Sequence, residues 1–216
     1  MARNVWIDIP LDDPIRQDRD EIVVRDDGHG MSYDECNGQY LVVGLERRRH
    51  TGDWTEPYNG LKPRRVQGRK GIGKLSGFGI ANRIEVRSIR GKEVSHFAMD
   101  YDDITRTATF ASEKGYPPKP LADDGESTRK KPGTRVTLSQ LKISRAIPKA
   151  QFFTGLARRL LVLDESFRVH VNGEEVTRAE IPFQFRFPSA KGTWKDETLD
   201  SGQVISWWAG FCKTPI

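Results

Sequence analysis

The sequence predicts an α+β fold, with a mostly antiparallel sheet that carries helices on one face. Two observations support this prediction. Runs that alternate apolar and polar residues outnumber the segments with helical periodicity. Neighbouring runs are joined by short links, which suit antiparallel pairing. The chain has 216 residues, which is enough for one domain and part of a second.

Strand-like runs occur along most of the chain. Two of them, Val5 to Ile9 and Glu21 to Asp27, open the chain, and we expect them to pair as a hairpin. Near the end of the patterned region, Asn172-Gly173 is a hairpin turn signal inside FRVHVNGEEV. Four further strands are expected at residues 83–90, 94–101, 105–112 and 134–141.

A first helix is expected directly after residue 31. Ser32 is a suitable N-cap, and Glu35 stands three residues later as its capping-box partner. The apolar side of this helix would carry Cys36, Tyr40 and Val43.

Two more helical segments are expected further along. Lys74 to Asn82 has an apolar side, although its glycines weaken a helix. Residues 143–163 place one apolar stripe at i, i+4, i+8 and i+11. The stripe consists of Phe152, Leu156, Leu160 and Leu163.

Composition and residue spacing permit an anionic partner and argue against a disulfide framework, a zinc site and a membrane span. The formal net charge is +5, which permits binding to phosphates or nucleic acid. Cys36 and Cys212 are far apart, and the four histidines lack metal-ligand spacing, so neither a disulfide framework nor a zinc site is indicated. No apolar run reaches the ~18 residues of a membrane span. We therefore expect a cytoplasmic protein that does not enter the membrane.

Two glycine-rich boxes are the most informative motifs. The first is RDDGHGM, Arg25 to Met31, and the second is GRKGIGKLSG, Gly68 to Gly77. Glycine lets the backbone turn and approach a ligand closely, and successive N–H groups at a helix start can hold a phosphate. The second box is not a Walker motif, because Leu75 occupies the position that requires serine or threonine.

The combination of motifs resembles the GHKL ATPases, the superfamily of gyrase B, the ninety-kilodalton heat-shock chaperones, sensor histidine kinases and MutL. The combination is DGHG at a strand end, a long polar lid, the second glycine box and the strand GTRVTL. It covers roughly Val5 to Val176 and is closest in style to MutL-, chaperone- or MORC-like proteins. The resemblance implies the two-layer α/β sandwich of the GHKL, or Bergerat, type.

The resemblance also implies a set of nucleotide-binding residues. Asp26 would accept a hydrogen bond from the adenine amino group, and Thr134 would lie beside it and share a water with the adenine. Asp27 would belong to the turn and not to the ligand shell. Gly28 and Gly30 would let the chain pass close to the adenine ring, and Met31, which follows the box as it often does in the family, would also belong to the binding residues. The second box would approach the phosphates through Gly68, Lys70, Gly71, Gly73 and Lys74.

By resemblance, the domain binds ATP or ADP with Mg²⁺ and acts as a nucleotide-driven conformational switch, with a homodimer forming in the full-length protein. The family's N-box helix precedes the first strand and supplies the metal-binding asparagine and the water-activating glutamate. This sequence begins at Met1 and opens almost directly on a strand, so we expect the N-box to be absent. The chain is then a fragment, has a start placed too late, or binds nucleotide without turning it over. Hydrolysis should be very weak, and we assign no catalytic or metal-binding residue.

The sequence also predicts a domain boundary and leaves a second function open. Residues 1–178 would form the ATP-binding domain, and residues 179–216 would begin a transducer-like domain. The alternative function is a non-catalytic module that holds nucleic acid or a protein partner through its basic lid, residues 45–67.

Overall fold

The computed structural model describes residues 2–43, 52, 54, 55, 57, 60, 63, 73–109, 116–122, 131–160, 167–177, 183–189 and 194–212. The chain divides into two compact units. The first consists of Met1–Lys149 and Asp164–Glu175, and the second of Ala150–Leu163 and Val176–Ile216. The domain boundary expected at residue 178 stays a prediction.

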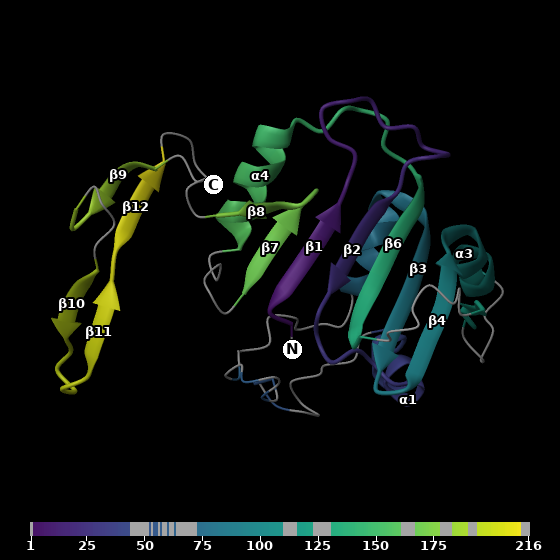
Figure 1. Ribbon diagram of the computed structural model, residues 1–216, viewed down its shortest axis with the longest axis horizontal. Helices are drawn as coiled ribbons and strands as arrows, with labels where there is room; N and C mark the ends of the chain where they lie inside the picture. The colour runs from purple at the N-terminus through teal and green to yellow at the C-terminus, as the bar shows by residue number, and fades with distance from the viewer. Residues whose placement is uncertain are drawn as a thin grey trace. The chain divides into compact units, whose positions relative to one another are not determined.

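Eight strands form one mixed sheet in the order β5-β4-β3-β6-β2-β1-β7-β8 (Figure 1). Strand β1 runs parallel to β7, whereas the pairs β1–β2, β2–β6, β3–β6, β3–β4 and β4–β5 are antiparallel. The α+β prediction is therefore confirmed, including the opening hairpin. The strands are β1 (Asn4–Asp8), β2 (Ile22–Asp26), β3 (Ala81–Arg90), β4 (Glu93–Asp100), β5 (Lys119–Pro120), β6 (Gly133–Leu141), β7 (Arg168–Val171) and β8 (Glu174–Val176).

The two faces of the sheet differ in what covers them. Alternation along β3 buries Ile84, Val86 and Ser88 on one face and turns Arg87 to the other. Val86 pairs with Phe97 of β4, and Tyr40 meets the Phe97 ring edge-on at 6.2 Å. The short helical segments therefore cover the face of Val86, as Figure 1 shows for α1 behind the sheet. We call the opposite face the open face.

The first helical segment begins as predicted and then changes its pitch. Ser32 and Glu35 form the complete capping box of α1 (Tyr33–Glu35). The chain continues as the π-helix η1 (Cys36–Tyr40), closed by a 2.8 Å hydrogen bond from the Leu41 N–H to the Cys36 carbonyl. A wider turn no longer follows the 3.6-residue period. Cys36 is buried as expected, but Val43 is 57% exposed, so its assignment to the apolar side was wrong.

The strand expected at residues 105–112 is wrong for its described part, which belongs to helix α3 (Tyr101–Thr109). Asp102 and Asp103 lie in the first turn, where carboxylates stabilise the helix dipole. The Thr105 hydroxyl donates to the Tyr101 carbonyl at 3.1 Å, a bond that lets threonine stay inside a helix. The strand prediction was therefore wrong because it relied on threonines at alternate positions, which this helix also accommodates.

The other two expected helices are shorter or tighter than predicted. The segment after the second glycine box is a 3₁₀ helix, η2 (Gly73–Gly79), with Phe78 buried. In the second unit, α4 (Lys149–Arg159) replaces the longer helix expected at 143–163 and starts directly after Pro148, whose ring cannot lie inside a helix. Its buried residues are Phe153 and Ala157, one position along from the predicted stripe.

The second unit also contains two antiparallel strand pairs. Strand β9 (Phe183–Phe187) pairs with β12 (Ala209–Cys212), and β10 (Lys195–Thr198) pairs with β11 (Val204–Trp207). The rings of Phe187 and Trp207 stack with centroids 5.4 Å apart. Throughout the part of the chain that the structure describes, no helix has the length and apolarity to cross a membrane.

Candidate functional site

Asp26 ends strand β2, and its carboxylate is held by backbone N–H groups. The Gly28 N–H donates to Oδ1 at 2.7 Å, and the Thr134 N–H on the neighbouring strand also donates to this carboxylate. Burial raises the pKa of the Asp26 carboxyl, while these two hydrogen bonds act in the opposite direction. The site thus contains a positioned, partly desolvated hydrogen-bond acceptor.

Two glycines allow the backbone to close around this carboxylate. Gly30 has φ +70°, and a Cβ there would lie 1.9 Å from the carbonyl oxygen of Ile89. Gly133 has φ +149°, and a Cβ there would lie 2.2 Å from the carbonyl oxygen of Asp26. Both positions combine a left-handed backbone with a contact that excludes every side chain. The first glycine box therefore packs directly against β3 and β6.

Ser88 is a residue of this site that the sequence analysis missed. Its hydroxyl oxygen accepts a 2.8 Å hydrogen bond from the Met31 N–H and shares a 2.9 Å hydrogen bond with the Thr134 hydroxyl. Ser88 is completely buried on β3, on the same face as Val86. A lone serine at an inward position of an alternating strand was the signal that could have identified it.

Asp27 has a structural task, in agreement with its assignment to the turn. Oδ1 accepts 2.8 Å hydrogen bonds from the Arg3 and Asn4 N–H groups, and Oδ2 accepts one from the Asn4 side chain at 2.6 Å. Partial burial would raise the pKa of Asp27, but the donors from Asn4 and Arg3 outweigh burial and hold it below its ordinary value. Asp27 therefore fixes the start of β1 against the end of β2.

Lys74 belongs to the 3₁₀ helix η2, and its side chain reaches the end of η1. Its ammonium group donates to the carbonyl of Val42 and, at 3.5 Å, to that of Gln39, and it lies 5.8 Å from the centroid of the Tyr40 ring. Burial lowers the pKa of Lys74. Gly73 begins η2 beside it. The remaining residues expected at the phosphates, Gly68, Lys70 and Gly71, lie outside the described residues.

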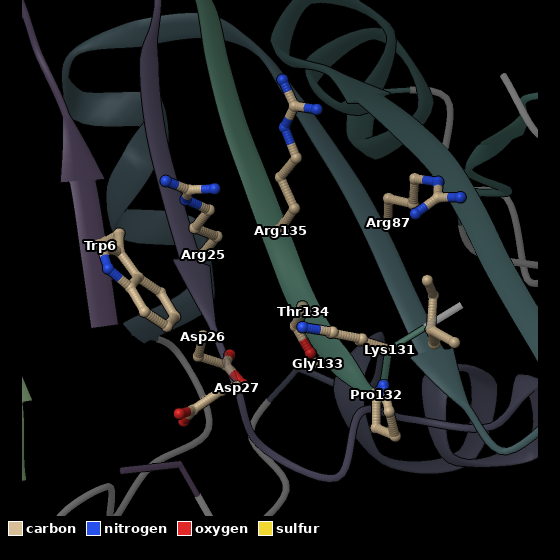
Figure 2. A pocket seen from close by; sticks show the side chains of 11 residues that line it. Trp6, Arg25, Asp26, Asp27, Arg87, Lys131, Pro132, Gly133, Thr134 and Arg135 are labelled. Atoms are coloured by element: carbon tan, nitrogen blue, oxygen red, sulfur yellow. The ribbon is translucent and has the colours of Figure 1, made fainter. Parts of the chain in front are cut away.

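A hollow of about 480 Å³ lies where β2 ends and β6 begins, beside Asp26 and Gly133. Figure 2 shows its wall, where Trp6, Arg25, Arg135 and Arg87 extend from four strands, with Asp26 and Asp27 at one end. Lys131 and Pro132 complete its rim on the segment that leads into β6. A cationic wall thus adjoins the strand ends that carry Asp26 and Thr134.

Comparison with known proteins identifies the class of this site. Residues 1–131 match the family described as "Histidine kinase-, DNA gyrase B-, and HSP90-like ATPase". The chain belongs to this ATPase family. The GHKL resemblance and its α+β fold are therefore confirmed, and Asp26 and the first glycine box lie inside the region that matches the ATPase family.

One curated relative is also similar to this chain. The Herpetosiphon aurantiacus protein named "Putative type II restriction enzyme HgiDII" is 30% identical over 178 residues. The alignment covers 82% of this chain and 28% of HgiDII, so the chain spans less than a third of the length of that relative.

The described residues of this ATPase-family chain fit an adenine better than a protein-bound metal. Asp26 offers a buried acceptor, and Gly30 leaves a close-packed backbone beside it. Among the residues that the structure describes, no group of three His, Cys, Asp or Glu side chains could hold a metal ion. Mg²⁺ commonly binds through substrate phosphates and only one or two carboxylates, so this finding is compatible with metal that arrives with a nucleotide.

Proposed function

We propose that this chain binds ATP, with the adenine selected by Asp26. The observation that carries the proposal is the partly desolvated Asp26 carboxylate, fixed by the Gly28 and Thr134 N–H groups. The 6-amino group of adenine is a hydrogen-bond donor and suits this acceptor. Guanine presents a carbonyl oxygen at the same position, which would leave two acceptors facing each other in a buried site. Such mismatches give strong discrimination.

Ser88 and Thr134 would act as positioning residues for this pocket. Ser88 ties the Met31 backbone to β3, and its hydrogen bond to Thr134 ties β3 to β6. The Thr134 N–H in turn holds Asp26. Adenine would therefore meet an acceptor whose position is fixed before binding, which lowers the entropic cost of association. The roles expected for Gly28, Gly30 and Met31 belong to the same proposal.

The phosphates would be held by the second glycine box with Lys74. In the structure the Lys74 ammonium group binds carbonyl oxygens at the end of η1. An incoming phosphate offers a full negative charge in place of these neutral carbonyl oxygens, so the ammonium group gains a direct Coulombic attraction to its acceptor. Gly68, Lys70, Gly71 and Gly73 would add backbone N–H groups and a second cation. Mg²⁺ would bind together with the phosphates.

Hydrolysis by this chain is proposed to be weak. A general base needs a carboxylate that is able to take a proton from water. The two carboxylates of the first box, Asp26 and Asp27, both accept hydrogen bonds from backbone N–H groups. ATP binding would then serve a conformational switch that involves lid closure and a homodimer in the longer protein.

The name of HgiDII suggests the setting of this switch. We propose that the chain is the ATP-binding module of a longer cytoplasmic protein that acts on DNA, as a restriction enzyme does. The basic lid, residues 45–67, lies mostly outside the described residues, so its role in holding nucleic acid stays a prediction.

Calorimetric titration with ATP, GTP and adenosine tests the proposal, with phosphate release measured on the same samples. We expect ATP to bind, GTP to bind much more weakly, and Asp26→Asn to remove ATP binding. Asp18→Asn, which makes the same chemical change in an exposed loop, is the matched control. Lys74→Ala should weaken ATP more than adenosine. If Asp26→Asn binds ATP with unchanged affinity, the adenine assignment is wrong.

A further inference from the structure

Three arginines stand side by side on the open face of the sheet. Strand register pairs Arg25 of β2 with Arg135 of β6, and Arg135 with Arg87 of β3. Trp6 of β1 pairs with Arg25 and continues the same line (Figure 2). We call these four residues the arginine row. Arg25 and Arg135 are exposed, and Arg87 is half-buried.

The arginine row places like charges opposite each other on neighbouring strands. Like charges directly opposite each other on neighbouring strands destabilise a sheet, and the row contains two such pairs in succession. Arg25 is partly compensated, because its guanidinium lies 5.3 Å from the centroid of the Trp6 ring and 4.0 Å from the carboxylate of Asp8. Three guanidinium groups in one line form a concentration of positive charge that is complementary to a polyanion.

The surroundings of the arginine row extend the cationic surface. The row lines the 480 Å³ hollow, and Lys131 adds another cation to its rim. Two carboxylates, Asp26 and Asp27, also line this hollow, but both accept hydrogen bonds from backbone N–H groups. The positive side chains therefore dominate the outward-facing part of the wall.

We propose that the arginine row is a docking surface for the phosphate backbone of duplex DNA. Neighbouring strands lie about 4.8 Å apart, so the Cα atoms of Arg25 and Arg87, two strands apart, are separated by about 10 Å. One strand of a duplex carries a phosphate every ~3.4 Å along the axis, so a row of this length can reach more than one phosphate of the same strand. Planar guanidinium groups also suit the bidentate recognition of phosphate oxygens.

Duplex DNA is favoured over single-stranded nucleic acid by the position of Trp6. Single strands are bound by stacking bases on open aromatic rings. The Trp6 ring already stacks on the His170 ring, with centroids 5.8 Å apart. The guanidinium of Arg25, its other neighbour, also contacts the Trp6 ring. Trp6 therefore positions Arg25 and offers little surface to a base. The inference deepens the proposed function, because it identifies where a DNA-acting protein would meet its DNA.

The test is fluorescence anisotropy of a labelled short duplex with the 216-residue chain, without ATP and over a series of salt concentrations. We expect Arg135→Gln to weaken binding several-fold, and the slope of log affinity against log salt to fall in magnitude by about 0.9 for each lost phosphate contact. Arg19→Gln is the matched control, since Arg19 is exposed in the loop that precedes the opposite end of β2.

Each result decides between the docking surface and another explanation. Loss confined to Arg135→Gln, with duplex preferred over single strands and over polyglutamate, supports the proposal. Equal losses in both variants would mean that general basic charge is responsible. A preference for polyglutamate would mean that the partner is an acidic protein. Either result overturns the proposed DNA surface, and so does the absence of binding. Since no nucleotide is present, these outcomes do not depend on ATP binding, so failure of the DNA surface and failure of the adenine assignment can be told apart.

Discussion

The N–H of Met31 donates a 2.8 Å hydrogen bond to the hydroxyl of Ser88, a residue 57 positions further along the chain. This bond connects the first glycine box to the central strand β3. Because Ser88 also shares a hydrogen bond with Thr134, one buried hydroxyl links three segments of the proposed adenine pocket.

Replacing Ser88 with alanine should affect both stability and nucleotide binding. The Met31 N–H would lose its acceptor in a buried position, which costs about 1–3 kcal/mol. We expect a lower free energy of unfolding in urea and weaker ATP binding by calorimetry. Ser139→Ala on β6 makes the same change away from this network and should have little effect. If Ser88→Ala matches the wild type in both measurements, the hydrogen bond has no role in the pocket.

Nucleotide affinity should depend on pH through Asp26. Its pKa is raised, chiefly by burial, from a reference value of 3.8. The carboxylate accepts the adenine amino hydrogen only when ionised, so ATP affinity should begin to fall at a higher pH than an ordinary aspartate would cause. Calorimetry in buffers from neutral to acidic pH would measure this fall. An affinity that stays constant until the pH reaches 3.8 would contradict the assignment.

The same shift in pKa has a consequence for stability, with a defined sign. For a carboxyl group whose folded pKa is raised, the stabilising contribution is complete below the unfolded pKa and is lost as pH rises through the folded pKa. Asp26→Asn removes this titration. The melting temperature of the variant minus that of the wild type should therefore increase as pH rises from the acidic range towards neutrality. A difference that decreases with pH would show that the pKa is lowered instead.

Two glycines with similar backbone angles should respond very differently to alanine. Gly30 has φ +70° and a Cβ position 1.9 Å from the Ile89 carbonyl oxygen, whereas Gly91 has φ +61° and open space around it. Gly91→Ala should cost about 1 kcal/mol from backbone strain alone. Gly30→Ala should cost roughly 3 kcal/mol or more, because the backbone must also move. Urea denaturation of both variants measures the difference, and equal costs would mean that the contact relaxes freely.

Reversing the central charge of the arginine row should separate stability from binding. Arg135→Glu replaces two like-charge pairs by two opposite-charge pairs, with Arg25 and Arg87. Each such pair is worth up to about 1 kcal/mol, which offsets the contact that Arg135 itself loses, so the variant should remain folded. Its affinity for duplex DNA should nevertheless be lost. A variant that unfolds more easily would show that Arg135 has a structural role, and unchanged DNA affinity would place the DNA elsewhere.

Local patterns in the sequence predicted much of the fold, because they act through neighbouring residues. Alternation identified β3, β4 and β6, and the Ser32–Glu35 capping box started α1 as expected. Asn172 and Gly173 adopt φ 49° and 86°, the left-handed pair that a two-residue hairpin requires. Thr105 was assigned to a strand because its hydrogen bond to Tyr101 cannot be recognised from residue type.

Residues of the candidate site that belong to recognisable motifs could be predicted, including Thr134, whose N–H donates to the distant Asp26. Asp26, Gly28 and Gly30 belong to one motif, and the family match includes all three. Ser88 joins them through strand pairing across the sheet, and the arginine row depends on the register of three strands. Register is a property of tertiary structure, so neither feature was visible in a sequence read residue by residue.

The parallel pairing of β1 with β7 has a consequence for how this chain folds. The Ile9 N–H and carbonyl group both hydrogen-bond the side chain of Asn172 at 2.9 Å, across 163 positions of sequence. Contacts between such distant residues slow folding, because a long loop must close before they form. During synthesis, β1 leaves the ribosome early and must wait for β7 with an unpaired edge that can join other chains. A fragment that ends after β6 should therefore aggregate more readily than one that includes β7.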